Sequence, residues 1–241
     1  LLDSEDHDTA IEGRLGVERR FATHWKGTAE LGGRGWEHAD DRVLARGVLE
    51  YAPSEDAVAA LAVEHGDQLE HSYSLESVQE GISRTGGRLS YWRQISSAWE
   101  GYGEVGGAWL SDSNGEIALG GSVAWRPFPA VDVQIAMALD AMHYQDLSPY
   151  YYSPDLDLGG TLSVMGRVPI HGALAFVFDA GGGAGFSQEQ GASSFGPAYR
   201  AKVGLRWDCG GFSAAVDAAR SQSVRESSYT THEAALRLSW S

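Results

Sequence analysis

The sequence has no apolar run of the length that a membrane-spanning helix needs, about 18 or more residues, and its mean hydropathy is -0.26. Proline is scarce, with 7 residues in 241, and helical spacing of apolar residues is nearly absent. A helical membrane protein and an ordinary mixed α/β domain are therefore both poor interpretations of this chain.

Cysteine and positive charge are also in short supply. Cys209 is the only cysteine, so the chain has no internal disulfide and no thiolate cluster for a metal. A net charge of -15 argues against nucleic acid as a partner and permits neutral or cationic ligands. No signal peptide precedes Leu1, but a mature chain would look the same, so export stays open.

Glycine and aromatic residues are abundant, with 31 Gly, 8 Trp and 10 Tyr, as in chains of many strands joined by turns. Apolar and polar residues alternate with period two in 116–126, 130–143, 155–167, 199–208 and the last residues of the chain. In 199–208, for example, Val203, Leu205 and Trp207 alternate with Lys202 and Arg206. Such a strand shows lipid only every second side chain, so it spans a membrane in about ten residues without a strong hydropathy signal.

A soluble β-sandwich alternates as well, so the links between strands decide between the two. Short links at 127–129, 168–172 and 209–211 interleave with longer polar links at 145–154, 188–197 and about 221–229. Outer-membrane barrels alternate short periplasmic turns with long outer loops in this way. Trp240, one residue from the end, resembles an aromatic-ended last strand, and we expect both termini in the periplasm.

The N-terminal half is less regular. We expect a polar segment over 1–10 and a barrel over 11–241, with strands over 11–21, 27–36, 43–51 and 57–65 and short links at 23–25 and 53–56. Residues 74–82 (SLESVQEGI) fit a short helix, a loop or a poorly alternating strand. About thirteen strands are recognisable, but a closed bacterial barrel has an even number, so we expect 14–16.

The sequence thus predicts an all-β fold, a transmembrane up-and-down antiparallel β-barrel. The residues expected to face lipid are Val131, Val133, Ile135, Leu205, Trp207, Leu236 and Leu238. Seven tryptophans near strand ends are interpreted as anchors at the membrane interface: Trp25, Trp36, Trp99, Trp109, Trp125, Trp207 and Trp240.

Several short motifs resemble one family. They are LSDSNG at 110–115, PYYYSP at 149–154, FGPAY at 195–199 and a tyrosine-led last strand from Tyr229. Over about residues 84–241 their order resembles the C-terminal barrels of bacterial exopolysaccharide export porins, a group that includes the poly-N-acetylglucosamine export porin and the outer-membrane component of cellulose synthase. The resemblance implies about sixteen strands, a lumen that conducts a nascent polysaccharide, and a periplasmic tetratricopeptide-repeat scaffold or other synthase-linked partner.

Charged residues of the polar parity are the candidate pore lining: Glu100, Glu104, Glu116, Arg126, Asp132, Asp140, Asp155, Asp157, Arg200, Lys202 and Arg206. Cross-strand ion pairs that only brace the wall are an equally good interpretation. Acidic residues outnumber basic ones 33 to 18, so a lumen with this bias would favour cations.

Enzymatic motifs are weak. His143, Asp146 and Ser148 lie close in sequence, but sequence neighbours seldom form a triad, and His38, His65 and His71 lack metal-ligand spacing. Glycines 181–183 and 185 precede no lysine, so they indicate close approach or a bend in a strand.

We therefore expect an outer-membrane porin that exports an exopolysaccharide, with no catalytic residues, cofactor or metal; its partners are polysaccharide and outer-membrane lipid. The alternative is a general diffusion porin or surface receptor without a link to a synthase.

Overall fold

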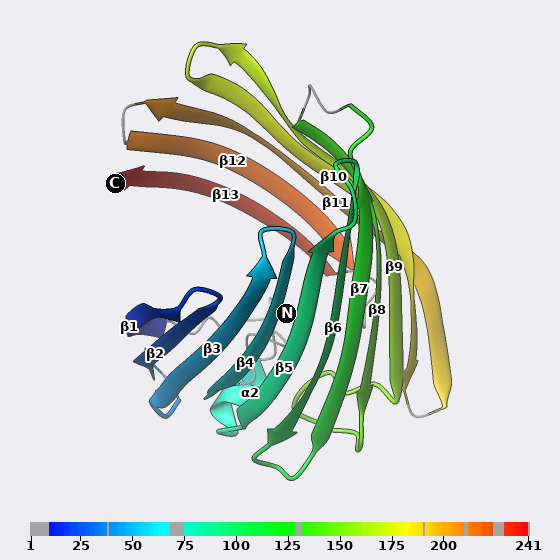
Figure 1. Cartoon of the computed structure of the whole chain (residues 1–241). Helices are drawn as coiled ribbons and strands as arrows, with labels where there is room; N and C mark the ends of the chain where they lie inside the picture. The colour runs from blue at the N-terminus through cyan, green and yellow to red at the C-terminus, as the bar shows by residue number, and fades with distance from the viewer. Residues whose placement is uncertain are drawn as a thin grey trace. The chain divides into compact units, whose positions relative to one another are not determined.

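The computed structural model describes residues 10–37, 39–67, 75–128, 132–189, 191–209, 212–223 and 229–240. Thirteen antiparallel strands follow one another in sheet order from first to last (Figure 1). The strands are β1 (Ala10–Ala22), β2 (Trp25–Trp36), β3 (Arg42–Ser54), β4 (Ala57–Asp67), β5 (Ser83–Gln94), β6 (Trp99–Leu110), β7 (Gly115–Trp125), β8 (Asp132–Tyr144), β9 (Leu156–His171), β10 (Leu174–Glu189), β11 (Ala192–Cys209), β12 (Phe212–Ser223) and β13 (Tyr229–Trp240).

The alternation that predicts strands also sorts the side chains onto two faces of the sheet. One face carries exposed large apolar residues in nearly every strand, such as Leu31 in β2, Leu119 in β7 and Leu162 in β9. We call it the apolar face. The other, which we call the polar face, carries the charged residues, among them Arg34 and Glu116, whose side chains are almost fully buried. A face that is oily yet exposed suits a sheet that meets lipid rather than water.

The residues predicted to face lipid differ in exposure where their side chains are described, and their contact with lipid stays a prediction. Leu205 and Trp207 are exposed on the apolar face, and Val133 and Ile135 are half-buried. Val131 and the side chains of Leu236 and Leu238 lie outside the described part. Aromatic residues gather at strand ends on this face: Trp25 lies 4.7 Å from Tyr51, and Trp99 stacks on Trp125 at 5.9 Å, measured between ring centroids.

All four strands predicted over residues 11–65 are confirmed, and each is slightly longer than expected. The described residues contain thirteen strands rather than the 14–16 expected. Residues 188–197 do not form the long polar link that their composition predicts: β10 continues to Glu189 and β11 begins at Ala192, with Gly191 at a positive φ of 77° in the turn. A tight hairpin turn needs such a residue, and glycine adopts it without steric cost.

Two smaller expectations also change. Residues 168–171 belong to β9, so the turn there is only 172–173, with Gly172 at φ 53°. Asp155 precedes β9 and lies outside the strand whose pattern it is expected to begin. Residues 75–79 form the short helix α2 (Leu75–Gln79), one of the three interpretations that the sequence left open. No helix among the described residues has the length and apolar character to cross a membrane.

The chain divides into two compact units. The first comprises residues 1–91, 104–119 and 142–155, and the second comprises 92–103, 120–141 and 156–241. A small apolar core lies in the first unit and consists of Ile82, Leu110, Tyr144 and Tyr151, with Met142 packed against it. The segment after α2 and the link between β8 and β9 therefore pack together.

Candidate conduction surface

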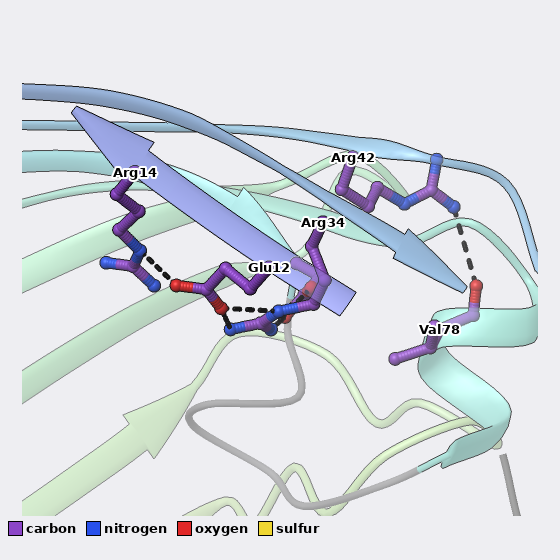
Figure 2. A network of polar contacts seen from close by, with 6 residues as sticks. Glu12, Arg14, Arg34, Arg42 and Val78 are labelled. Atoms are coloured by element: carbon purple, nitrogen blue, oxygen red, sulfur yellow. Dashed lines mark hydrogen bonds and ion pairs between the residues drawn. The ribbon is translucent and has the colours of Figure 1, made fainter. Parts of the chain in front are cut away.

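In the first unit the polar face begins with an ion-pair chain centred on Arg34. Its guanidinium Nη1 donates to Asp67 Oδ2 at 2.7 Å, and its Nε donates to Glu12 Oε2 at 2.8 Å. Arg14 binds the other oxygen of Glu12, so one carboxylate joins two arginines (Figure 2). The planar fork of arginine suits this double pairing, and it stays charged at any physiological pH.

Arg84 of β5 is the second buried centre of this unit. It donates to Glu116 from Nη2 at 3.0 Å and from Nε at 3.2 Å, and its Nη1 contacts Glu64. The hydroxyl of Tyr144 donates to the same Glu116 at 3.0 Å. The side chain of Arg84 is 9% exposed and that of Glu116 is 5% exposed, so neither charge is bare to solvent. This pairing braces β4, β5 and β7 against one another.

Two motifs that carried the family resemblance meet in this unit. The side-chain amide of Asn114 donates to the backbone oxygen of Asp146 at 2.6 Å and to the hydroxyl of Tyr151 at 2.9 Å, and its own oxygen accepts from the backbone N–H of Asp146 at 2.9 Å. The Tyr151 hydroxyl donates to Asp112 Oδ2 at 2.9 Å. Asn114 thus clamps the link 145–155 onto the turn between β6 and β7.

Tyr151 lies in a link rather than in a strand, and its phenol is strongly perturbed. Burial raises the pKa of Tyr151 above its ordinary value; the hydrogen bond with Asn114 works against this, and the Asp112 carboxylate adds to it. The phenol therefore stays protonated and remains a donor to Asp112. Arg42 Nη2 reaches the backbone oxygen of Val78 in α2 at 3.4 Å, so the helix is also held by the polar face (Figure 2).

In the second unit the paired arginines of the polar face are far more solvated than Arg34 and Arg84 of the first. Glu100 accepts from Arg126 Nη2 at 3.0 Å and from Gln134 Nε2. Arg200 pairs with Asp179 at 3.2 Å, while Asp208 joins Arg206 at 3.0 Å and Arg167 at 2.7 Å. The arginine side chains of these pairs are 39–53% exposed. A hydrated, charge-lined surface of this kind can contact sugar hydroxyls weakly and repeatedly.

A shallow hollow of about 180 Å³ lies on the second unit beside Asp140 and Asp157. Gly159, Gly160 and Gly185 are among the residues that line it, and a Cβ at Gly159 would touch the Asp140 carboxylate. Nearby, a Cβ at Gly183 would collide with the backbone oxygen of Gly160. The interpretation of glycines 181–183 as a place of close strand approach is confirmed at Gly181 and Gly183, whereas a Cβ at Gly182 would meet nothing within 4 Å.

The predicted pore-lining residues do not form one cluster. Glu104 and Glu116 belong to the first unit and pair with Arg88 and Arg84. Asp132 and Asp140 are exposed on β8, Asp157 is buried, and Lys202 lies in register with Asp179. Asp155 is exposed in the link, where its backbone oxygen contacts His143 Nδ1. Their role as a pore lining stays a prediction.

Sequence reasoning missed the charges of the N-terminal half: Glu12, Arg34, Glu64, Asp67 and Arg84. The signal was present, because Glu12, Arg14, Glu18 and Arg20 alternate with Ile11, Leu15 and Val17, but interspersed glycines weaken it. Of the histidines, His65 bonds Thr85 Oγ1 at 2.7 Å, while His38 and His71 lie outside the described residues. Within the described part no group of three His, Cys, Asp or Glu side chains could hold a metal ion.

Comparison with known proteins rests on structure alone. No family model matches the sequence, and no curated protein matches it. A solved structure titled "Bacterial polysaccharide outer membrane secretin" superimposes with a TM-score of 0.77 at 13% identity, covering 96% of this chain and 80% of the other. The fold is that of an outer-membrane β-barrel. The translocator domain of the autotransporter NalP from Neisseria meningitidis also matches, with a TM-score of 0.40, 12% identity, and coverage of 97% and 80%.

Proposed function

We propose that this chain spans the outer membrane and exports an exopolysaccharide from the periplasm to the cell surface along its polar face. The observation that carries the proposal is the sorting of side chains: exposed apolar residues cover one face, and solvated ion pairs of the second unit occupy the other. Lipid on one side and a hydrated, charged wall on the other are what polymer passage through a bilayer requires.

Two further observations support an exporter over a general diffusion porin. The fold matches that of a protein described as a bacterial polysaccharide outer membrane secretin. The link 145–155, which carries the PYYYSP motif of the family resemblance, is held on the first unit by Asn114 and Tyr151. A link held in place in this way suits guided passage of one extended chain better than free diffusion.

Partners follow from the same proposal. Synthesis of the polymer would supply the driving force for export. A periplasmic tetratricopeptide-repeat scaffold or another synthase-linked protein would connect the synthase to this chain. Outer-membrane lipid would cover the apolar face. Both termini are expected on the periplasmic side.

The test is a polysaccharide-secretion assay on a deletion strain, with cell-associated and secreted polymer measured separately. We expect secreted polymer to fall and cell-associated polymer to rise, and the intact chain to restore secretion. Uptake of small hydrophilic solutes is measured in the same strains. Unchanged secretion together with reduced solute uptake would contradict export and favour a general diffusion porin.

A further inference from the structure

A groove of about 540 Å³ crosses the apolar face of the first unit near one end of β5 to β8. Its volume falls in the range of about 300–1,000 Å³ that is usual for small-ligand sites. Gly87, Gly107 and Gly115 line it from three neighbouring strands, so no side chain fills it there. The indole of Trp109 forms a wall: it is 72% exposed, and its ring would lie 3.0 Å from a Cβ placed at Gly115.

The groove is open toward the apolar face and polar at its other end. Exposed Leu89, Val105 and Leu119 continue the apolar surface of the same three strands. At the strand ends stand His143 and Gln145, the latter with its side-chain oxygen 3.3 Å from the same Gly115 position. Since His143 Nδ1 faces the backbone oxygen of Asp155 at 2.5 Å, that nitrogen carries the proton and Nε2 is left for a ligand.

We propose that this groove binds one membrane phospholipid, with an acyl chain along the glycine floor and the phosphate at His143 and Gln145. The inference rests on the proposed membrane-spanning role, because continuity with the lipid-facing surface is what selects a lipid as the occupant. A groove that is apolar along its floor and polar at one end fits a molecule with an apolar chain and a polar headgroup. The side-chain amide of Gln145 is a donor to a phosphate oxygen, and Nε2 of His143 is a second polar partner for the headgroup.

The experiment uses the full chain in nanodiscs of phosphatidylethanolamine and phosphatidylglycerol that contain a phospholipid with a photoreactive acyl chain. After irradiation, the labelled peptides are mapped. We expect labelling of residues 105–119 to exceed labelling of the equally lipid-facing residues 199–209 several-fold. Uniform labelling of all apolar segments, or a dimer cross-linked through this groove, would overturn the proposal.

Gly87→Leu fills the floor, and the strand tolerates it because a Cβ there meets nothing closer than 3.7 Å. Gly182→Leu is the matched control. Gly182 lies on the apolar face of β10 in register with the exposed Leu162 of β9, and a Cβ there would meet nothing within 4 Å. Labelling of 105–119 should fall several-fold in Gly87→Leu and stay unchanged in Gly182→Leu; equal labelling in the two variants would refute the site. If Gly87→Leu does not fold, the wild-type labelling pattern decides alone.

Failure of the lipid site and failure of the proposed function give different results. Labelling that is uniform over the apolar face, with polymer secretion intact, refutes only the groove. A folded chain without acyl-chain labelling on any apolar segment refutes the membrane-spanning role as well.

Discussion

The polar faces of the two units arise from the same alternation of residues, but several of their arginine side chains differ in exposure. In the first unit Arg34 and Arg84 are 10% and 9% exposed, and each joins two carboxylates. In the second unit Arg200 and Arg206 are 53% and 49% exposed, and each pairs with one aspartate. The first arrangement holds strands together, whereas the second leaves charge in contact with water.

The difference shows that a charged residue at the polar parity does not by itself report a pore lining. A buried ion pair must be compensated almost completely, because desolvation of each charge costs several kcal/mol. A solvated pair contributes little and is easily broken. The proposed transport role is therefore better sought at the solvated pairs, most of which lie in the second unit with Arg88–Glu104 in the first, and a structural role at Arg34 and Arg84.

The largest expected effect comes from removing one arginine in each unit. Arg84→Met leaves the buried carboxylate of Glu116 without its main partner. We therefore expect a loss of about 3–5 kcal/mol in the free energy of unfolding. Arg200→Met should cost about 0–1 kcal/mol. Urea unfolding in the presence of phospholipid vesicles measures both. Equal losses would erase the distinction between the two polar faces.

A second pair of variants asks whether the apolar faces are alike. Leu119→Arg in the first unit and Leu205→Arg in the second each place a charge among exposed apolar residues. We expect a cost of up to about 2–4 kcal/mol in both, largest near the bilayer midplane. Thiol probes at Leu205→Cys and Trp207→Cys give an independent answer. If they report bulk water in the folded protein, the membrane assignment is wrong.

Tyr151→Phe tests the clamp of the first unit. It removes the hydroxyl that bonds Asp112 and Asn114, so opening of residues 145–155 should become easier by about 1–3 kcal/mol. Hydrogen exchange of these residues measures the change. Tyr150→Phe is the control because Tyr150 neighbours it in the same link but is 38% exposed. Similar exchange in the two variants would exclude a clamp at Tyr151.

The same tyrosine predicts a pH dependence. Since the folded pKa of Tyr151 is raised above the ordinary value of 10.0, its contribution to stability is complete below pH 10.0 and is lost as the pH rises above it. Exchange of residues 145–155 should therefore accelerate above that pH in the wild type. The increment should be absent in Tyr151→Phe. An identical increment in both would assign it to other groups.

The smallest free-energy change is expected from the exposed carboxylates. The triple variant Asp132→Asn, Asp140→Asn, Asp155→Asn should fold normally and lower the cation selectivity of the channel in planar bilayers, an effect that salt screens. Asp132 and Asp140 belong to the second unit, so their double variant should account for most of it. Anion selectivity of the wild type, or an unchanged triple variant, would leave these residues without a role in conduction.

Much of the fold was predictable because a strand's two faces are encoded by period two. The strands over 199–208 and 130–143 show this most clearly, and β11 and β8 lie there. The long link expected at 188–197 was wrong because its glycine, serine and glutamine residues resemble a loop in composition. In the structure Ser187 pairs with Ser194 and Phe186 with Phe195, so a hairpin extends through them. Cross-strand pairing satisfies the backbone there whatever the side chains suggest.

The sequence by itself determined that this protein is a sheet with one apolar and one polar face, because successive side chains of a strand point to opposite faces. It also determined which residues lie on the polar face, such as Glu116 and Arg200. Only the tertiary structure decided which of them are buried in ion pairs and which stay hydrated, and that Asn114 and Tyr151, 37 residues apart, share a hydrogen bond. The burial and the partners of a side chain depend on which strands and links become neighbours. The alternation of residues within one strand does not specify those neighbours.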